Sequence, residues 1–143
     1  MLASPRPAMN PAPRAHRARL RRLLLLAHAA ITGVAGLVLA VRPDAIPASV
    51  GIHLAREGYL LSYLLAAAEF GFAALSWFGA WMTDPHSLRA TMLSCVVFHG
   101  SSAVLEAIAW RSHPVPALLA NILARLIIVG GFLALLPRRA ESG

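Results

Sequence analysis

The stretch VPALLANILARLIIVGGFLALL, from Val115 to Leu136, decides the fold class of this chain. It has about the 20 residues that a helix needs to cross roughly 30 Å of hydrocarbon, and Arg125 is its only charged residue. Three further apolar blocks of similar length precede it, at residues 20–41, 58–82 and 88–110. The sequence therefore predicts an all-α integral membrane protein, a four-helix antiparallel bundle in which the last span covers residues 115–136.

The overall composition agrees with a membrane protein. The chain is 58% hydrophobic and 13% charged, whereas soluble domains carry about 25% charged residues. This composition excludes a soluble enzyme, a disulfide-rich scaffold and a disordered chain. Cys95 is the only cysteine, so an internal disulfide is excluded, and a small buried residue is the favoured interpretation of this side chain.

The arginines predict the orientation of the chain in the membrane. All 13 basic residues are Arg. With the first span leading outward, nine fall on the inner side: Arg6, Arg14, Arg17, Arg19, Arg21, Arg22, Arg89, Arg138 and Arg139. Three fall on the outer side: Arg42, Arg56 and Arg111. The positive-inside rule then predicts a multi-pass membrane protein with both termini in the cytoplasm.

The same arginines border segments of hydrocarbon length and do not alternate with aromatic residues. They therefore favour contact with membrane lipids over binding of nucleic acid. The proline-rich residues 1–19 predict a disordered cytoplasmic tail, and residues 137–143 a second cytoplasmic tail. The first block could also be a signal peptide, but its length and the three spans after it favour an uncleaved helix.

The connections between the blocks differ in length. Residues 83–87 and 111–114 are tight connections, which predict that the helices they join are antiparallel neighbours. Residues 42–57 are longer and mix apolar with polar side chains. Two interpretations stay open for this segment: a short interfacial helix over the outer end of the bundle, or an ordinary loop.

Polar residues recur at helical spacing within each block. On the third block, Thr91, Cys95, His99, Ser102 and Glu106 follow one another by three or four positions. On the other blocks the corresponding residues are Ser62, Glu69 and Ser76, then Asn121 and Arg125, then His28 and Thr32. Such spacing places each set on one face of its helix. Because polar groups are costly in hydrocarbon, we expect all four faces to point inward.

The ionisable residues form the candidate site. Glu69, His99 and Arg125 each fall near the middle of a span, and we expect Glu69 and Arg125 to pair because two lone charges would together cost about 5–7 kcal/mol. The candidate catalytic residues are Glu69, His99, Glu106 and Arg125. The candidate ligand-binding residues are Asn121, Ser102, Cys95 and His28. The alternative is that these groups only hold the helices together.

No metal or cofactor is predicted. One deep histidine with two carboxylates lacks a recognised ligand spacing. The sequence contains no phosphate-binding loop, nucleotide fingerprint or serine-hydrolase motif.

Three features together resemble a known group of proteins. They are a glycine-containing first helix ending at Arg42-Pro43, the run FGFAALSW from Phe70 to Trp77, and a central His99 on the third helix. In these features the chain is similar to the small bacterial four-helix membrane proteins of the DoxX-like and DUF4345-like kind. The resemblance implies four spans and, for some DoxX-like members, quinone-linked oxidation. Glu69 belongs to no motif of that group.

Three functions fit these residues. The first is an accessory or binding protein of the bacterial inner membrane whose polar cavity holds a small lipophilic ligand. The second is an intramembrane enzyme that isomerises, cyclises or hydrolyses an isoprenoid, quinone or polyketide by acid–base chemistry. The third is a proton-coupled transporter, which would need a homo-oligomer because four helices are few for alternating access.

Overall fold

A computed structural model describes residues 12–137 of the chain and confirms the all-α fold class. Its long helices are α1 (Ala12–Val41), α3 (Tyr59–Gly79), α4 (Pro85–Ser112) and α5 (Pro116–Leu135). Two short elements, helix α2 (Ala45–Ser49) and the 3₁₀ turn η1 (Arg56–Gly58), lie between α1 and α3. The long helices pack as antiparallel neighbours.

The helix ends differ from the predicted span ends for local reasons. Helix α1 begins at Ala12, so residues 12–19 are helical and their prediction as a disordered tail is wrong. This stretch is rich in Ala and Arg, which favour helix, and Pro13 falls in the first turn, where a helix tolerates it. The rest of the predicted tails, residues 1–11 and 138–143, lies outside the described residues.

The start of α4 is fixed by a cap. The Asp84 carboxylate accepts hydrogen bonds from the Ser87 backbone N–H at 2.7 Å and from the Ser87 hydroxyl at 2.6 Å. Pro85 occupies the first helical position. Together these residues begin the helix earlier than the predicted residue 88, since an N-cap carboxylate satisfies an otherwise unpaired N–H.

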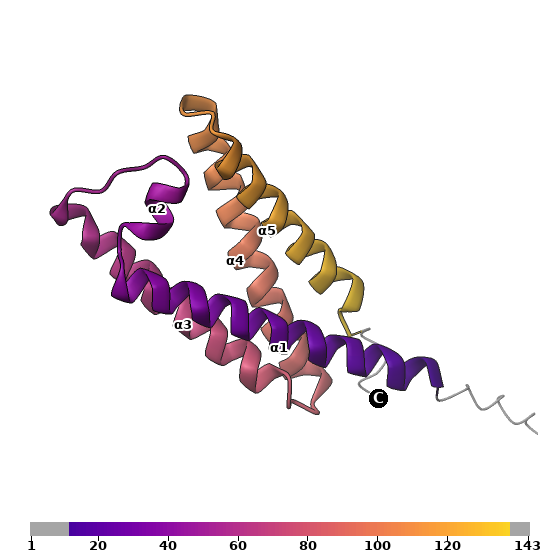
Figure 1. Cartoon of the computed structure of the whole chain (residues 1–143). Coiled ribbons are helices and arrows are strands. Elements are labelled where there is room, and N and C mark those ends of the chain that lie inside the picture. Colours follow the sequence, from indigo (N-terminus) through magenta and orange to yellow (C-terminus); the bar gives the residue numbers. More distant parts are fainter. Residues whose placement is uncertain (1–11, 138–143) are drawn as a thin grey trace, which may run out of the picture.

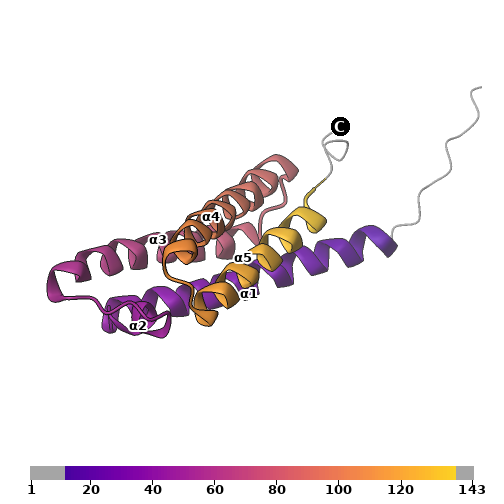
Figure 2. The same ribbon diagram turned by 90° about the horizontal axis from the view of Figure 1, so that it is seen from above.

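The four long helices form two hairpins. Helix α1 packs along α3, and α4 packs along α5. The hairpins lie close together where α3 passes into α4 and diverge toward the other end (Figure 1). Seen from above, the hairpin of α4 and α5 lies over that of α1 and α3 (Figure 2). Helices α3 and α4 also touch toward the middle of α4, where the Phe72 and Phe98 rings stack with centroids 4.1 Å apart. A tight connection thus makes these two helices neighbours without keeping them parallel along their length.

Two apolar clusters join the hairpins. Near the close end, Leu25 of α1, Met92 and Cys95 of α4 and Phe132 of α5 are almost completely buried. Near the open end, Ala103, Leu118 and Ile122 form a second cluster, against which Val50 packs.

Val50 follows α2, so residues 42–57 reach across from the first hairpin to the second (Figure 1). A hydrogen bond from the Ser62 hydroxyl to the Pro43 carbonyl, at 2.7 Å, fastens this segment to α3. Residues 42–57 thus contain one short helix, α2, within an otherwise largely irregular connection.

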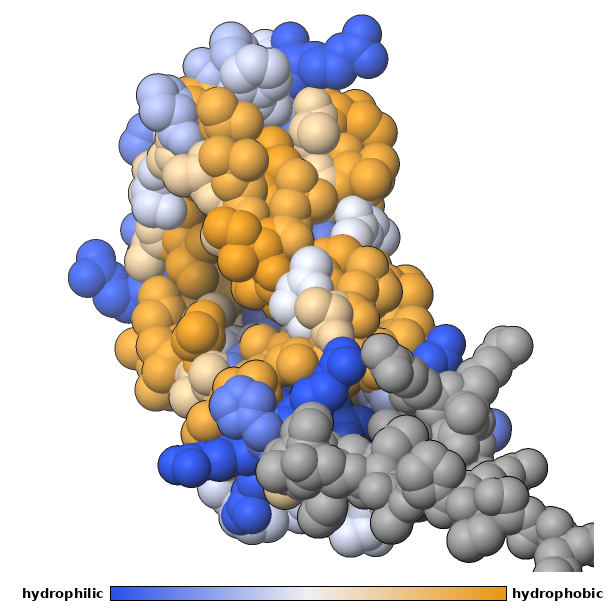
Figure 3. Space-filling model, turned by 90° about the vertical axis from the view of Figure 1, so that its right-hand side faces the viewer, coloured by the Kyte–Doolittle hydropathy of each residue, from blue (hydrophilic) through white to orange (hydrophobic). Residues whose placement is uncertain are grey.

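The surface is that of a multi-pass membrane protein. All four long helices are long and apolar enough to span a membrane. Large apolar side chains are exposed on them, for example Ile31 at 67% and Ile127 at 75%. Figure 3 shows an apolar belt between polar ends. Water would solvate such a belt poorly, whereas lipid tails would cover it.

Candidate functional site

The polar faces point inward, as predicted. The buried members are His28, Thr32, Ser62, Glu69, Ser76, Thr91, Cys95 and His99. The half-buried members are Ser102, Glu106, Asn121 and Arg125. Hydrogen bonds divide the central residues into a histidine pair near the close end of the hairpins and an arginine–carboxylate cluster nearer the open end.

The histidine pair joins the two hairpins. Nε2 of His28, on α1, lies 2.7 Å from Nε2 of His99, on α4. On its other side His28 places Nδ1 2.7 Å from the Ser76 hydroxyl of α3. Ser76 in turn lies 3.6 Å from the Cys95 sulfur. One continuous chain of polar groups therefore connects α1, α3 and α4.

Arg125 connects the pair to a carboxylate. Its Nε donates to Oε1 of Glu106 at 2.8 Å, and its terminal nitrogen lies 3.4 Å from Nδ1 of His99. The Asn121 amide donates to the same Glu106 oxygen at 3.0 Å. The arginine–carboxylate cluster thus consists of Glu106, Asn121 and Arg125, and Arg125 belongs to both parts of the site.

This geometry assigns the histidine protons. A guanidinium only donates hydrogen bonds, so Nδ1 of His99 accepts from Arg125 and the proton of neutral His99 sits on Nε2. That proton is donated to Nε2 of His28. Neutral His28 then carries its own proton on Nδ1 and donates it to Ser76. All donors in the chain from Arg125 to Ser76 point in one direction, an arrangement in which each bond polarises the next.

One oxygen of the cluster lacks a partner. Oε1 of Glu106 accepts two hydrogen bonds, but Oε2 is buried and accepts none from the described residues. A buried acceptor left unpaired costs about 1–3 kcal/mol. Such an atom in an otherwise well-bonded cluster is where an additional donor would bind.

The predicted pairing of Glu69 with Arg125 is wrong. Arg125 forms its ion pair with Glu106, and within residues 12–137 the Glu69 carboxylate forms no ion pair or hydrogen bond. Glu69 lies on α3 of the first hairpin, whereas Arg125 lies on α5 of the second. Glu106, on the helix next to Arg125, is closer.

The remaining candidates divide between the site and local structure. Ser102 donates to the Phe98 carbonyl of its own helix at 2.7 Å, so it does not join the cluster. Ser76, interpreted from sequence as a packing residue, is part of the histidine chain. Its depth could have indicated this, because His28, Ser76 and His99 all lie a few turns from the inner ends of their spans.

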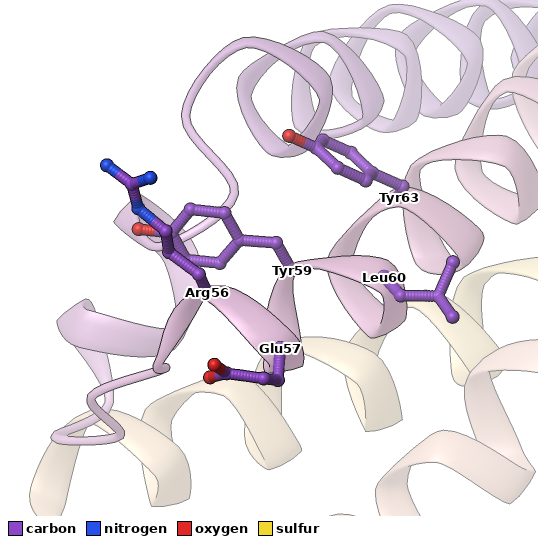
Figure 4. Close-up of a pocket in the computed structure, with 5 residues that line it drawn as sticks. All are labelled: Arg56, Glu57, Tyr59, Leu60 and Tyr63. Atoms are coloured by element: carbon purple, nitrogen blue, oxygen red, sulfur yellow. The ribbon is translucent and has the colours of Figure 1, made fainter.

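The structure also contains hollows away from this site. One of about 630 Å³ lies around the first turn of α3 and is lined by Arg56, Glu57, Tyr59, Leu60 and Tyr63. Figure 4 shows these five side chains projecting from η1 and the start of α3 without converging on a common point. This open surface hollow has no arrangement suited to binding or catalysis.

Within the part of the chain that the structure describes, no three His, Cys, Asp or Glu side chains are grouped so that they could hold a metal ion. Comparisons with models of protein families, with curated proteins and with solved structures find no match to this chain. The resemblance drawn from sequence is thus supported in its coarse form, a four-helix protein with four candidate membrane spans.

Proposed function

We propose that this protein binds a small lipophilic molecule whose polar head carries an O–H or N–H group, and that Glu106 accepts a hydrogen bond from this head. The observation that carries the proposal is the buried and unpartnered Oε2 of Glu106. Arg125 and Asn121 hold the other oxygen, so the free one has a fixed direction. A donor on a lipophilic ligand would satisfy it.

The cost of the cluster supports a binding role. An ionised residue within hydrocarbon costs about 2.5–3.5 kcal/mol, and such residues are commonly functional. Pairing Glu106 with Arg125 offsets much of this cost, but apolar residues could pack the hairpin without it. Recognition of a head group by the preorganised Glu106 carboxylate would explain why this charged pair is present within the span.

The arrangement of the hairpins suggests how the ligand reaches the cluster. They diverge toward the end that carries Glu106 and Asn121, and Val50 packs across this end. In this proposal the ligand enters sideways from the lipid, so that its tail lies among the exposed apolar side chains and its head reaches Glu106. This route suits a molecule dissolved in the membrane.

A matched pair of probes tests the proposal. Farnesol has a hydroxyl donor, while farnesyl methyl ether keeps the tail and the oxygen but lacks the donor. Titrated against the purified protein in nanodiscs, farnesol should bind at least about tenfold more tightly than the ether, equivalent to about 1.4 kcal/mol.

The variant Glu106→Leu should lose this preference, while Glu57→Gln, at an exposed carboxylate on the other hairpin, should keep it. Equal affinities for alcohol and ether in the unaltered protein would contradict the proposal. So would a preference that survives in Glu106→Leu.

A second function, acid–base catalysis on the bound molecule, is favoured by the histidine chain. His99 and Glu106 both contact Arg125, and His28 stands behind His99 with an aligned proton. An acid beside the ligand could add a proton to one carbon of a double bond, and a base could then remove an allylic proton from the resulting cation, so that the double bond moves. Enzymatic exchange of farnesol C–H for deuterium in D₂O would support catalysis. The exchange should vanish in His99→Ala while binding persists. No exchange in the unaltered protein would contradict catalysis and support binding as the sole function.

We further propose that the protein lies in the bacterial inner membrane with both termini in the cytoplasm, as a relative in type of the DoxX-like proteins. The described arginines support this orientation, since Arg17, Arg19, Arg21, Arg22 and Arg89 gather at one end of the long helices. Reporter fusions after residues 45, 85, 113 and 143 should be outside, inside, outside and inside. An outside location for residue 143 would contradict this topology.

A further inference from the structure

A groove at the inner end of the molecule is separate from the site described above. It encloses about 520 Å³ between the N-terminal half of α1 and the connection from α3 to α4. Arg19, Arg21 and Arg22 line it from α1, and Trp81 and Thr83 line it from the connection. Its apolar lining includes Leu25, Gly79 and Leu88.

The groove has a positive lining. Among the described residues that form it, three are Arg and none is Asp or Glu. Arg19 and Arg22 form no ion pair with any described residue. Asp84, which follows Thr83 in the sequence, directs its carboxylate to Ser87 at the α4 cap.

Two neighbouring arginines differ from Arg19 and Arg22 in that their side chains are already hydrogen-bonded. Arg17 donates to the Ala134 carbonyl at 2.8 Å, and Arg89 donates to the Pro137 carbonyl at 2.8 Å. These side chains satisfy backbone carbonyls at the end of α5, whereas Arg19 and Arg22 remain available to an anion.

Trp81 orients one of the available arginines. The Arg22 guanidinium lies 3.6 Å from the centroid of the Trp81 ring. Stacking on an aromatic face holds a planar guanidinium in place and leaves its N–H edge to donate. A tryptophan between an apolar helix and a basic end is also typical of the level of lipid head groups.

We propose that this groove binds the phosphodiester of an anionic phospholipid. Arg19 and Arg22 donate to the phosphate, and the Thr83 hydroxyl, on the opposite wall, faces the rest of the head group. A phospholipid fits better than free phosphate because the lining of the groove is apolar as well as charged, with Ala80, Trp81 and Leu88 beside the arginines. Basic pockets at this level of membrane helices recognise anionic head groups.

The test compares phosphatidylglycerol and phosphatidylcholine with identical acyl chains, measured by native mass spectrometry of the full chain in neutral detergent. Phosphatidylglycerol should bind about tenfold or more tightly than phosphatidylcholine. The double variant Arg19→Gln with Arg22→Gln should reduce this preference to within about threefold. The matched control, Arg56→Gln with Arg111→Gln at the outer end, should retain it.

Two further arms keep the proposal testable. Trp81→Leu removes the stacking partner without changing charge and should weaken the preference, which provides a second variant if the double variant does not fold. Inorganic phosphate at millimolar concentration should not displace the lipid. Equal binding of the two lipids, full displacement by phosphate, or an equal loss in the outer control pair would each overturn the proposal.

Discussion

Nε2 of His28 and Nε2 of His99 lie 2.7 Å apart, so the two hairpins of this protein are joined by a hydrogen bond between imidazoles. The rings meet nearly at right angles, and the His28 ring also packs edge-on against Phe132. This contact requires one donor and one acceptor. Because Arg125 donates to the other nitrogen of His99, His99 is the donor and His28 the acceptor. The polar chain is therefore both a structural link and a directed path from the carboxylate cluster.

Replacing either histidine should destabilise the protein, and the two losses should not add. His28→Leu or His99→Leu leaves the partner ring without its hydrogen bond, at a cost of about 1–3 kcal/mol. Once one ring is gone, removing the other should cost less, with a coupling free energy of about 0.5–2 kcal/mol. Unfolding in SDS of the two single variants and the double variant measures this coupling. Strictly additive losses would show that the rings do not interact.

The partner of Arg125 can be established in the same way. Arg125→Leu should destabilise the protein by exposing the paired Glu106 to hydrocarbon, and adding Glu106→Leu should restore part of the loss. Glu69→Leu serves as the matched comparison, because Glu69 forms no ion pair with Arg125, and its coupling to Arg125→Leu should be weaker than that of Glu106→Leu. Stronger coupling of Arg125 to Glu69 than to Glu106 would contradict the observed pairing.

Helix α3 approaches α4 closely at Gly79, which has no side chain. A Cβ at Gly79 would lie 2.7 Å from Cγ2 of Thr91, whereas a Cβ at Gly71 would meet no atom within 4 Å. Gly79→Ala should therefore cost about 1–3 kcal/mol in unfolding free energy. Gly71→Ala should be neutral or slightly stabilising.

Thr91→Ser removes Cγ2 and should recover much of the loss caused by Gly79→Ala. Melting temperatures in detergent provide the measurement. If both glycine variants melt alike, the close contact does not limit packing.

The Asp84 cap of α4 should make the stability of the protein depend on pH. Two hydrogen bonds from Ser87 lower the pKa of Asp84 below its usual range. The stabilisation by the carboxylate is complete above the pKa of about 4 that Asp has in an unfolded chain. It is lost as the pH falls through the lower folded-state pKa.

Asp84→Ala should therefore lower the melting temperature at pH 7, and the difference from the unaltered protein should shrink below about pH 4. Asp84→Asn, which keeps an acceptor without a charge, should lose less than Asp84→Ala at pH 7. A difference between the unaltered protein and Asp84→Ala that stays constant from pH 7 to pH 2 would argue against this cap.

Much of the fold follows from local properties of the sequence. The lengths of the apolar blocks predicted four spans, and the spacing of residues such as Cys95 and His99 predicted which faces are buried. Both depend only on helix geometry. The start of α1 at Ala12 was missed because a helix can extend beyond the hydrocarbon, where apolar content no longer marks its end.

The pairing within the site depends on how the helices diverge, which block lengths do not determine. Counting depth placed Glu69 and Arg125 at one level, but they lie on different hairpins. The tight connection at His113-Pro114 contained a better signal, because Glu106 and Asn121 are about equally far from it along the chain. Residues equidistant from a tight turn face each other across a hairpin.

Infrared difference spectroscopy of the Glu106 carboxylate tests ligand binding most directly, because it observes the oxygen that accepts the proposed hydrogen bond. Farnesol added to protein labelled with ¹³C-glutamate should shift a carboxylate stretching band, whereas farnesyl methyl ether should not. The shift should be absent in Glu106→Gln and unchanged in Glu57→Gln. Farnesol binding with no carboxylate change, or a shift that persists in Glu106→Gln, would contradict the proposal that Glu106 receives the head group.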